Sequence, residues 1–219
     1  MKKIAIFDLD GTLLNTLNSI AYCCNKALED YNIDPLDISI YPNFIGHGAD
    51  ALVKGLADYV GITDDAFPEF KKHYLSIYNK NGSYNVAPYK NIPELLATLK
   101  DKGIKTAILS NKPQLITEQC CKIHFDGIFD EICGQKAGVP VKPDTTQLFA
   151  ILNKFGFNTE DCIYCGDSDV DIMTGKNAKV LTLGAAWGFY GDKPFKDADG
   201  IIYDPLELLN YIKNKGLLN

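Results

Sequence analysis

The sequence predicts an α/β fold in which a doubly wound, Rossmann-like parallel sheet carries an inserted small α-helical cap domain. Short runs that are apolar on both faces predict strands covered from both sides, as in a parallel sheet. Amphipathic helical patterns separate these runs, and this alternation is typical of a doubly wound sheet. The alternation stops between residues 15 and 85, where only helical patterns occur.

Four apolar runs predict the main strands of the sheet. In the first of them, IAIF, every side chain is apolar, so neither face suits water. Two weaker strands are expected near residues 130–133 and 200–203. The four main runs are Ile4–Phe7, Lys105–Leu109, Cys162–Cys165 and Lys179–Leu183.

Helices are expected between these strands, and their ends carry recognisable signals. Asn91 is expected to cap a helix that stops at Gly103, because Asn favours helix starts and Gly favours helix ends. The remaining helices of the core are expected to start at Pro113, to follow Asp144 as far as Gly156, and to follow Asp167.

Residues 15–85 contain three amphipathic helical segments and no credible strand. In the second segment, Leu52, Leu56 and Tyr59 recur at spacings of three and four, which places them on one helix face. We therefore predict that residues 15–85 form the cap domain and that residues 1–14 and 86–219 form the α/β core. The joints are expected near residues 15–17 and 84–88.

Composition limits the classes of partner. The chain has 219 residues, with 22 Lys and Arg against 28 Asp and Glu, and a formal net charge of −6. This balance argues against nucleic acid or an anionic membrane surface as a partner. No segment is apolar enough to cross a bilayer or to serve as a signal peptide, so we expect a cytoplasmic protein.

Seven cysteines are expected to be reduced thiols, because they lack the spacing of a disulfide framework. Cys162 and Cys165 form a CxxC pattern, which elsewhere binds zinc or undergoes redox cycling. Here the pattern lies in a predicted strand, where residues three apart point to opposite faces. The two thiols are therefore expected to be buried separately.

Acidic side chains follow two of the predicted strands. Asp8 and Asp10 come directly after the first, and Asp167 and Asp171 follow a later one. Ligands of open α/β sheets bind outside the carboxyl ends of the strands, so these carboxylates are expected to cluster. While the strand stays extended, Asp8 and Asp10 are expected to project in the same direction, and we expect a hard divalent cation, Mg²⁺, to hold the cluster together.

Donors suited to phosphate oxygens occur at the same end of the predicted sheet. They are the hydroxyls of Thr12 and Ser110, the backbone N–H groups after Gly11, and the ammonium of Lys142. Carboxylates for a metal beside donors for phosphate indicate phosphoryl transfer. A carboxylate can also accept the phosphoryl group itself, as an aspartyl-phosphate.

Four motifs in this order resemble the haloacid-dehalogenase superfamily of phosphohydrolases. The most specific is DLDGTL at residues 8–13, and the alignable pattern covers essentially the whole chain. The segments FIGHGADALVKGL, GVPVKPDTT and AAWGF look like the phosphoglycolate-phosphatase branch of that superfamily. Hydrolytic dehalogenases of the superfamily lack an aspartate at the position of Asp10, so Asp10 argues for phosphate chemistry.

The resemblance implies a role for each site residue. Asp8 would be the nucleophile and a metal ligand, and Asp10 the general acid and base, with its backbone carbonyl on the metal. Asp167 would be the third protein ligand, and Asp171 would support the metal directly or through water. Lys142 would neutralise the charge on the phosphoryl group, which would be held by Thr12, Ser110 and Asn111.

The substrate is expected to be a small phosphorylated metabolite, with 2-phosphoglycolate as the best guess. His47, between two glycines of the predicted cap, or Lys54 would then meet the substrate carboxylate. Related activities remain open: a pyrophosphatase, a sugar-phosphate phosphatase or a phosphomutase. From another class, the chain could be a non-enzymatic phospho-receiver domain. A monomer and a homodimer are both compatible with the sequence.

Overall fold

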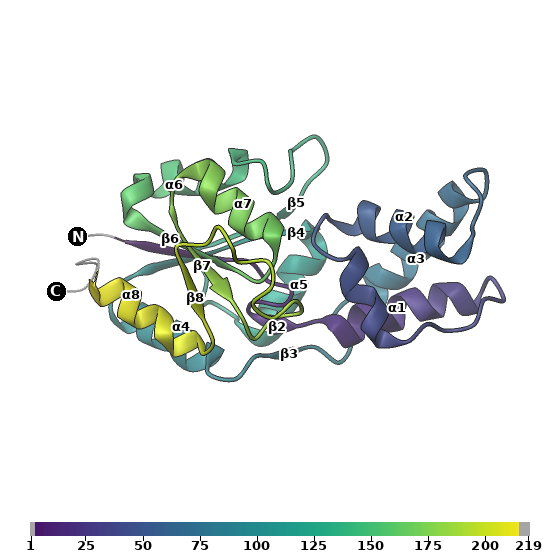
Figure 1. Ribbon diagram of the computed structural model, residues 1–219, viewed down its shortest axis with the longest axis horizontal. Coiled ribbons are helices and arrows are strands. Elements are labelled where there is room, and N and C mark those ends of the chain that lie inside the picture. Colours follow the sequence, from purple (N-terminus) through teal and green to yellow (C-terminus); the bar gives the residue numbers. More distant parts are fainter. Residues whose placement is uncertain (1–2, 215–219) are drawn as a thin grey trace.

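A computed structural model describes residues 3–214 and confirms the predicted α/β class. One sheet of six parallel strands has the order β5-β4-β1-β6-β7-β8 (Figure 1). Its strands are β1 (Ile4–Phe7), β4 (Lys105–Pro113), β5 (Glu131–Gln135), β6 (Cys162–Gly166), β7 (Leu181–Ala185) and β8 (Gly200–Ile202).

Two strands differ from the prediction at one end. β4 continues to Pro113, and its register against β5 shifts between Leu109 and Pro113. β7 begins at Leu181 instead of Lys179, because Lys179 adopts the left-handed conformation that ends the preceding helix (φ 56°). The extension of β4 matters for function, since it carries residues 110–112 along the floor of the site described below.

Helices cover both faces of the sheet (Figure 1). Ile4 and Ile6 pack with the apolar side of α6, whereas Ala5 and Phe7 belong to the larger core that includes α4, α5 and α8. Successive side chains of a strand alternate between faces, which explains this division. The helices are α4 (Ile92–Asp101), α5 (Gln114–His124), α6 (Thr146–Phe155), α7 (Asp169–Ala178) and α8 (Leu208–Asn214), with short 3-10 turns η2 (Thr159–Asp161) and η3 (Pro205–Glu207).

Asn91 departs from its predicted role. It precedes α4 as expected, but its backbone is left-handed (φ 66°) and its side chain caps no helical N–H group. The amide donates instead to Asp204 Oδ2 at 2.7 Å. Gly156 ends α6 in the left-handed conformation, in agreement with the prediction.

The segment after the first motif is helical. It contains α1 (Leu17–Glu29), the 3-10 helix η1 (Ile38–Phe44), α2 (Ala49–Val60) and α3 (Phe67–Asn81), which gather at one end of the molecule, away from the sheet (Figure 1). Two short strands that the sequence analysis missed, β2 (Leu14–Asn15) and β3 (Ala87–Pro88), pair antiparallel. The chain therefore leaves and re-enters the sheet region through adjacent connections.

The cysteines follow the prediction. All seven are buried and free, and Cys162 and Cys165 lie in different hydrophobic clusters on opposite faces of the sheet. Burial raises the pKa of both thiols. Among residues 3–214, no helix has the length and apolar character needed to cross a membrane.

Candidate active site

A cavity of about 40 Å³ lies between the carboxyl ends of the central strands and the helices of residues 15–85. Its floor comes from the ends of β1, β4 and β6, which carry Asp8, Ser110 and Asp167. Its opposite wall comes from α1, α2, α3 and the loop that precedes α2. The sequence analysis expected the ligand at this edge of the sheet.

Three carboxylates form the acidic cluster of this site: Asp8, Asp167 and Asp171. Each offers an oxygen within 4.8 Å of the others, and all three residues are buried. Glycines make room for the middle one, because a Cβ atom at Gly11 or Gly188 would lie 2.1 or 2.3 Å from atoms of Asp167. Side chains at these two positions would displace the carboxylate.

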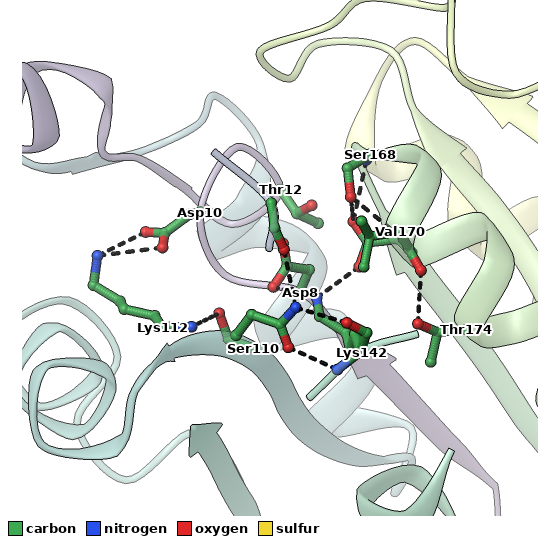
Figure 2. Close-up of polar contacts among 12 residues, drawn as sticks. Asp8, Asp10, Thr12, Ser110, Lys112, Lys142, Ser168, Val170 and Thr174 are labelled. Atoms are coloured by element: carbon green, nitrogen blue, oxygen red, sulfur yellow. Dashed lines mark hydrogen bonds and ion pairs between the residues drawn. The ribbon is translucent and has the colours of Figure 1, made fainter. Parts of the chain in front are cut away.

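Lys142 is the cation within the cluster. Its Nζ lies 2.7 Å from Asp171 Oδ1 and 2.8 Å from Asp8 Oδ1, and the side chain is 3% exposed (Figure 2). The side-chain amide of Asn111 fixes the backbone of Lys142 through two hydrogen bonds. Asn111 Oδ1 accepts from the Lys142 N–H at 2.8 Å, and Asn111 Nδ2 donates to the Lys142 carbonyl at 3.0 Å. The ammonium is therefore held in place by both its side chain and its backbone.

The charges of the cluster are not balanced. Three carboxylates share one ammonium, and burial raises the pKa of Asp8 to about 7 although Lys142 opposes this rise. The pKa of Asp167 is raised well above its ordinary value, first by burial and then by the neighbouring Asp171 and Asp8. Burial alone would raise the pKa of Asp171 too, but Lys142 and hydrogen bonds from Ser168 and Tyr164 lower it.

Asp171 is the most completely satisfied carboxylate of the three. Its Oδ1 accepts from Lys142 and from the Tyr164 hydroxyl at 2.6 Å. Its Oδ2 accepts from the Ser168 hydroxyl at 2.6 Å and the Ser168 N–H at 3.1 Å. This geometry favours a residue that orients Lys142 over one that binds a metal directly.

The residues fit a hard divalent cation. The donors are all carboxylate oxygens, they converge within a few ångströms, and they carry uncompensated negative charge in a buried place. Asp8 and Asp167 would hold such an ion by their side chains. Mg²⁺ is a hard divalent cation that prefers oxygen ligands of this kind.

Asp10 points away from the acidic cluster toward Lys112, because the extended strand that a shared direction with Asp8 required does not continue that far (Figure 2). The strand ends at Phe7 and the chain bends at Leu9, so the extended alternation is broken before Asp10 is reached. The Asp10 carboxylate instead accepts from Lys112 Nζ at 2.9 and 3.3 Å (Figure 2). Its backbone carbonyl remains a predicted metal ligand.

Three predicted phosphate-binding residues lie at the cavity or beside it. Ser110 lines the cavity, and its hydroxyl accepts from the N–H of Lys112 at 3.3 Å. The Thr12 hydroxyl donates to Asp167 Oδ1 at 3.4 Å, so in this structure it is hydrogen-bonded to a carboxylate. Asn111 lines the cavity, but its side-chain amide is engaged with Lys142 and with the Gly46 carbonyl.

The two cap cations proposed for the substrate carboxylate are not at the cavity. His47 is exposed and does not line it, although Gly46 and Gly48 on either side do. Lys54 pairs with Asp58 and Asp64 in an exposed part of the insert. The turn at residues 46–48 carries the backbone over the core and leaves the imidazole outside. Asp169, two residues before Asp171 of the acidic cluster, is also exposed.

Contacts between the helical segment and the sheet region were not foreseen. The Tyr190 hydroxyl lies 2.9 Å from the Pro42 carbonyl and 3.0 Å from the Ile45 carbonyl. The neighbouring Phe189 N–H donates to Asp167 Oδ2 at 2.9 Å, so one loop touches both the acidic cluster and the insert. A lone tyrosine or lysine far away in the sequence has no spacing signal that would reveal such contacts.

Comparisons with known proteins agree with this geometry. Residues 5–185 match the family model of haloacid dehalogenase-like hydrolases. A phosphoglycolate phosphatase of Mannheimia succiniciproducens is 29% identical, over 96% of this chain and 98% of that protein. A phosphoglycolate phosphatase of Aquifex aeolicus is 33% identical, over 85% of this chain and 86% of that protein.

Solved structures give the same result for the fold. The crystal structure of a predicted phosphoglycolate phosphatase from Haemophilus somnus has a TM-score of 0.88 at 28% identity, covering 96% of this chain and 97% of that one. A hydrolase from Pseudomonas syringae has a TM-score of 0.74 at 25% identity, covering 97% and 99% of the two chains.

Proposed function

This chain belongs to the haloacid dehalogenase-like hydrolase family, and we propose that it is a Mg²⁺-dependent phosphatase that hydrolyses a small phosphomonoester through an aspartyl-phosphate on Asp8. The observation that carries the proposal is the buried cluster of Asp8, Asp167 and Asp171, with Lys142 between two of them, at the floor of a cavity. Names of the relatives support a phosphatase.

Each residue has a task in this proposal. A carboxylate oxygen of Asp8 attacks phosphorus as the bond to the leaving alkoxide breaks, and Asp10 gives the alkoxide a proton. Asp10 then takes a proton from the water that hydrolyses the phosphorylated Asp8, releasing inorganic phosphate. Ser110 and Lys142 hold the oxygens of the transferring group. When bound, the metal neutralises phosphate charge and orients the phosphoryl group.

Before the reaction starts, the Asp10 carboxylate is paired with Lys112 and lies away from Asp8. Because Asp10 is only partly buried, a side-chain rotation would bring its carboxylate toward the leaving group. Asp171 would act through Lys142, as its hydrogen bonds suggest. Residues 15–85 would form the cap that closes over the substrate and excludes water.

The best single substrate is 2-phosphoglycolate, by analogy with the named relatives. The limited free space above Asp8 supports a small molecule. Free, buried cysteines support the expected cytoplasmic, reducing environment. Inorganic phosphate, glycolate and Mg²⁺ would then be the small molecules that the site handles.

Release of inorganic phosphate tests the proposal. We would compare 2-phosphoglycolate, pyrophosphate and a panel of sugar phosphates, with Mg²⁺ and with a chelator. Asp8→Asn should abolish release, while Asp169→Asn, at an exposed position beside the same cluster, should retain it. Mg²⁺-dependent release that prefers another substrate would keep the mechanism and reject 2-phosphoglycolate. No release from any substrate would contradict the phosphatase assignment and favour a mutase or a phospho-receiver.

A further inference from the structure

Lys112 is a buried cation at the cavity that the proposed chemistry does not use. It comes from the end of β4, and its side chain is 0% exposed. Its Nζ lies 2.9 Å from Asp10 Oδ1 and donates to the Tyr78 hydroxyl of α3 at 2.7 Å. An ammonium has three N–H donors, and here the two oxygens of Asp10 and the Tyr78 hydroxyl accept from it; rotation of Asp10 toward the leaving group would free the donors that Asp10 holds.

The charges around the cavity restrict where a second anionic group of a substrate could bind. Among the described residues that line it, the cations are Lys112 and Lys142. Lys142 already pairs with Asp8 and Asp171, at the place where the phosphoryl group would react. Figure 2 shows the amine of Lys112 apart from that cluster, beside Asp10.

Within the described residues, the rest of the cavity wall offers no charged partner for a substrate carboxylate. Ile20, Ile45 and Leu52 present apolar surface, and a buried carboxylate beside such groups needs a charged partner. Tyr74, which also lines the cavity, has a buried hydroxyl with no hydrogen-bond partner among residues 3–214. Its ring stacks on that of Tyr78 at 5.5 Å, so an unsatisfied hydroxyl belongs to the tyrosine pair beside Lys112.

We propose that Lys112, with Tyr78, is the specificity site for an anionic group on the leaving side of the substrate, a carboxylate in 2-phosphoglycolate. Lys142 serves the phosphoryl end and Lys112 the carboxylate end, and the helices of residues 15–85 contribute the tyrosine that closes the site. The inference rests on the proposed function, because it assumes that a phosphoryl group occupies the acidic cluster.

Binding to a protein that cannot turn substrate over tests this inference. In an Asp8→Asn background with Mg²⁺ present, we would measure the affinities of 2-phosphoglycolate and ethylene glycol monophosphate by calorimetry. The two ligands have similar size and the same phosphate, and they differ in one carboxylate. The background should prefer 2-phosphoglycolate, and Lys112→Met should reduce that preference about 10- to 100-fold, the range of a lost charge-assisted hydrogen bond.

The ratio of the two affinities makes the test robust. A partly unfolded Lys112→Met protein lowers the apparent binding of both ligands alike and leaves their ratio intact. Tyr78→Phe, which removes only a hydroxyl, should reduce the preference by a smaller factor. An unchanged ratio in Lys112→Met, whether both affinities fall equally or neither changes, would overturn the inference.

A different measurement, phosphate release by the wild-type protein, tests the proposed function separately. If the wild-type protein releases no phosphate from either ligand while the preference depends on Lys112, the phosphatase assignment falls and the carboxylate site stands. If phosphate is released from both ligands at equal efficiency and with equal affinity, the phosphatase stands and the carboxylate site falls.

Discussion

Removing Lys142 should be the most destabilising change at this site. Lys142→Met would leave Asp8 and Asp171 buried together without the ammonium that lies 2.8 and 2.7 Å from their oxygens. Loss of one partner of a buried ion pair costs about 3–5 kcal/mol, because the remaining charge stays desolvated. For a chain of this length, 1 kcal/mol shifts Tm by about 2–4 °C, so the expected fall in Tm is about 6–20 °C.

Thermal unfolding followed by circular dichroism, with a chelator present at neutral pH, measures this fall. Lys154→Met is the matched control, because Lys154 pairs with Glu131 at the surface and its loss should leave Tm nearly unchanged. In an Asp171→Asn background, Lys142→Met should cost less, since one of the two stranded charges is gone. A Lys142→Met protein as stable as the Lys154→Met control would refute the reasoning.

Two further predictions concern the metal and the cap. Burial raises the pKa of Asp8 from 3.8 to about 7. Between these two pH values the folded, metal-free protein binds more protons than the unfolded chain, so its Tm should fall as the pH rises through this range. Mg²⁺ competes with those protons, so the rise in Tm that it produces should grow over the same range, and a Mg²⁺ effect that shrinks with pH would contradict this. Tyr190→Phe removes the hydrogen bonds from the hydroxyl to the Pro42 and Ile45 carbonyls. Amide hydrogen exchange at residues 42–48 should therefore become faster, by the factor that corresponds to about 1 kcal/mol. Tyr203→Phe, at an exposed tyrosine, should leave the exchange rate unchanged.

The sheet and the acidic cluster were predictable because they follow from local patterns. Each strand is a short apolar run, and the carboxyl ends of parallel strands meet at one edge of the sheet. That rule alone brings Asp8, Asp167 and Asp171 together, although long stretches of chain separate the first from the others. Lys142 was found through its place in the order of motifs, and it does lie in the cluster.

Side-chain direction beyond a strand end was not predictable. Alternation holds only along an extended strand, and the strand ends at Phe7 with a bend at Leu9. Asp10 therefore does not point with Asp8 and lies beside Lys112. The position of His47 could not be predicted for a related reason: the glycines on either side allow a backbone path that the sequence does not define, and in the structure the residue is exposed and does not line the cavity. The partners of Lys112 and Tyr190 come from distant segments, and only the folded chain brings them into contact.

The most direct test of the account is a search for a phosphoryl group on Asp8. The Asp10→Asn protein, with Mg²⁺ and p-nitrophenyl phosphate, would be quenched in acid, digested and analysed by mass spectrometry. The nitrophenolate leaves without a proton from Asp10, whereas hydrolysis of the phosphorylated enzyme needs Asp10 and should slow by about 10²–10⁴. The account predicts that the peptide containing Asp8 carries the phosphoryl group. Nitrophenolate release with Asp8 unmodified, or undiminished release by Asp8→Asn, would contradict it.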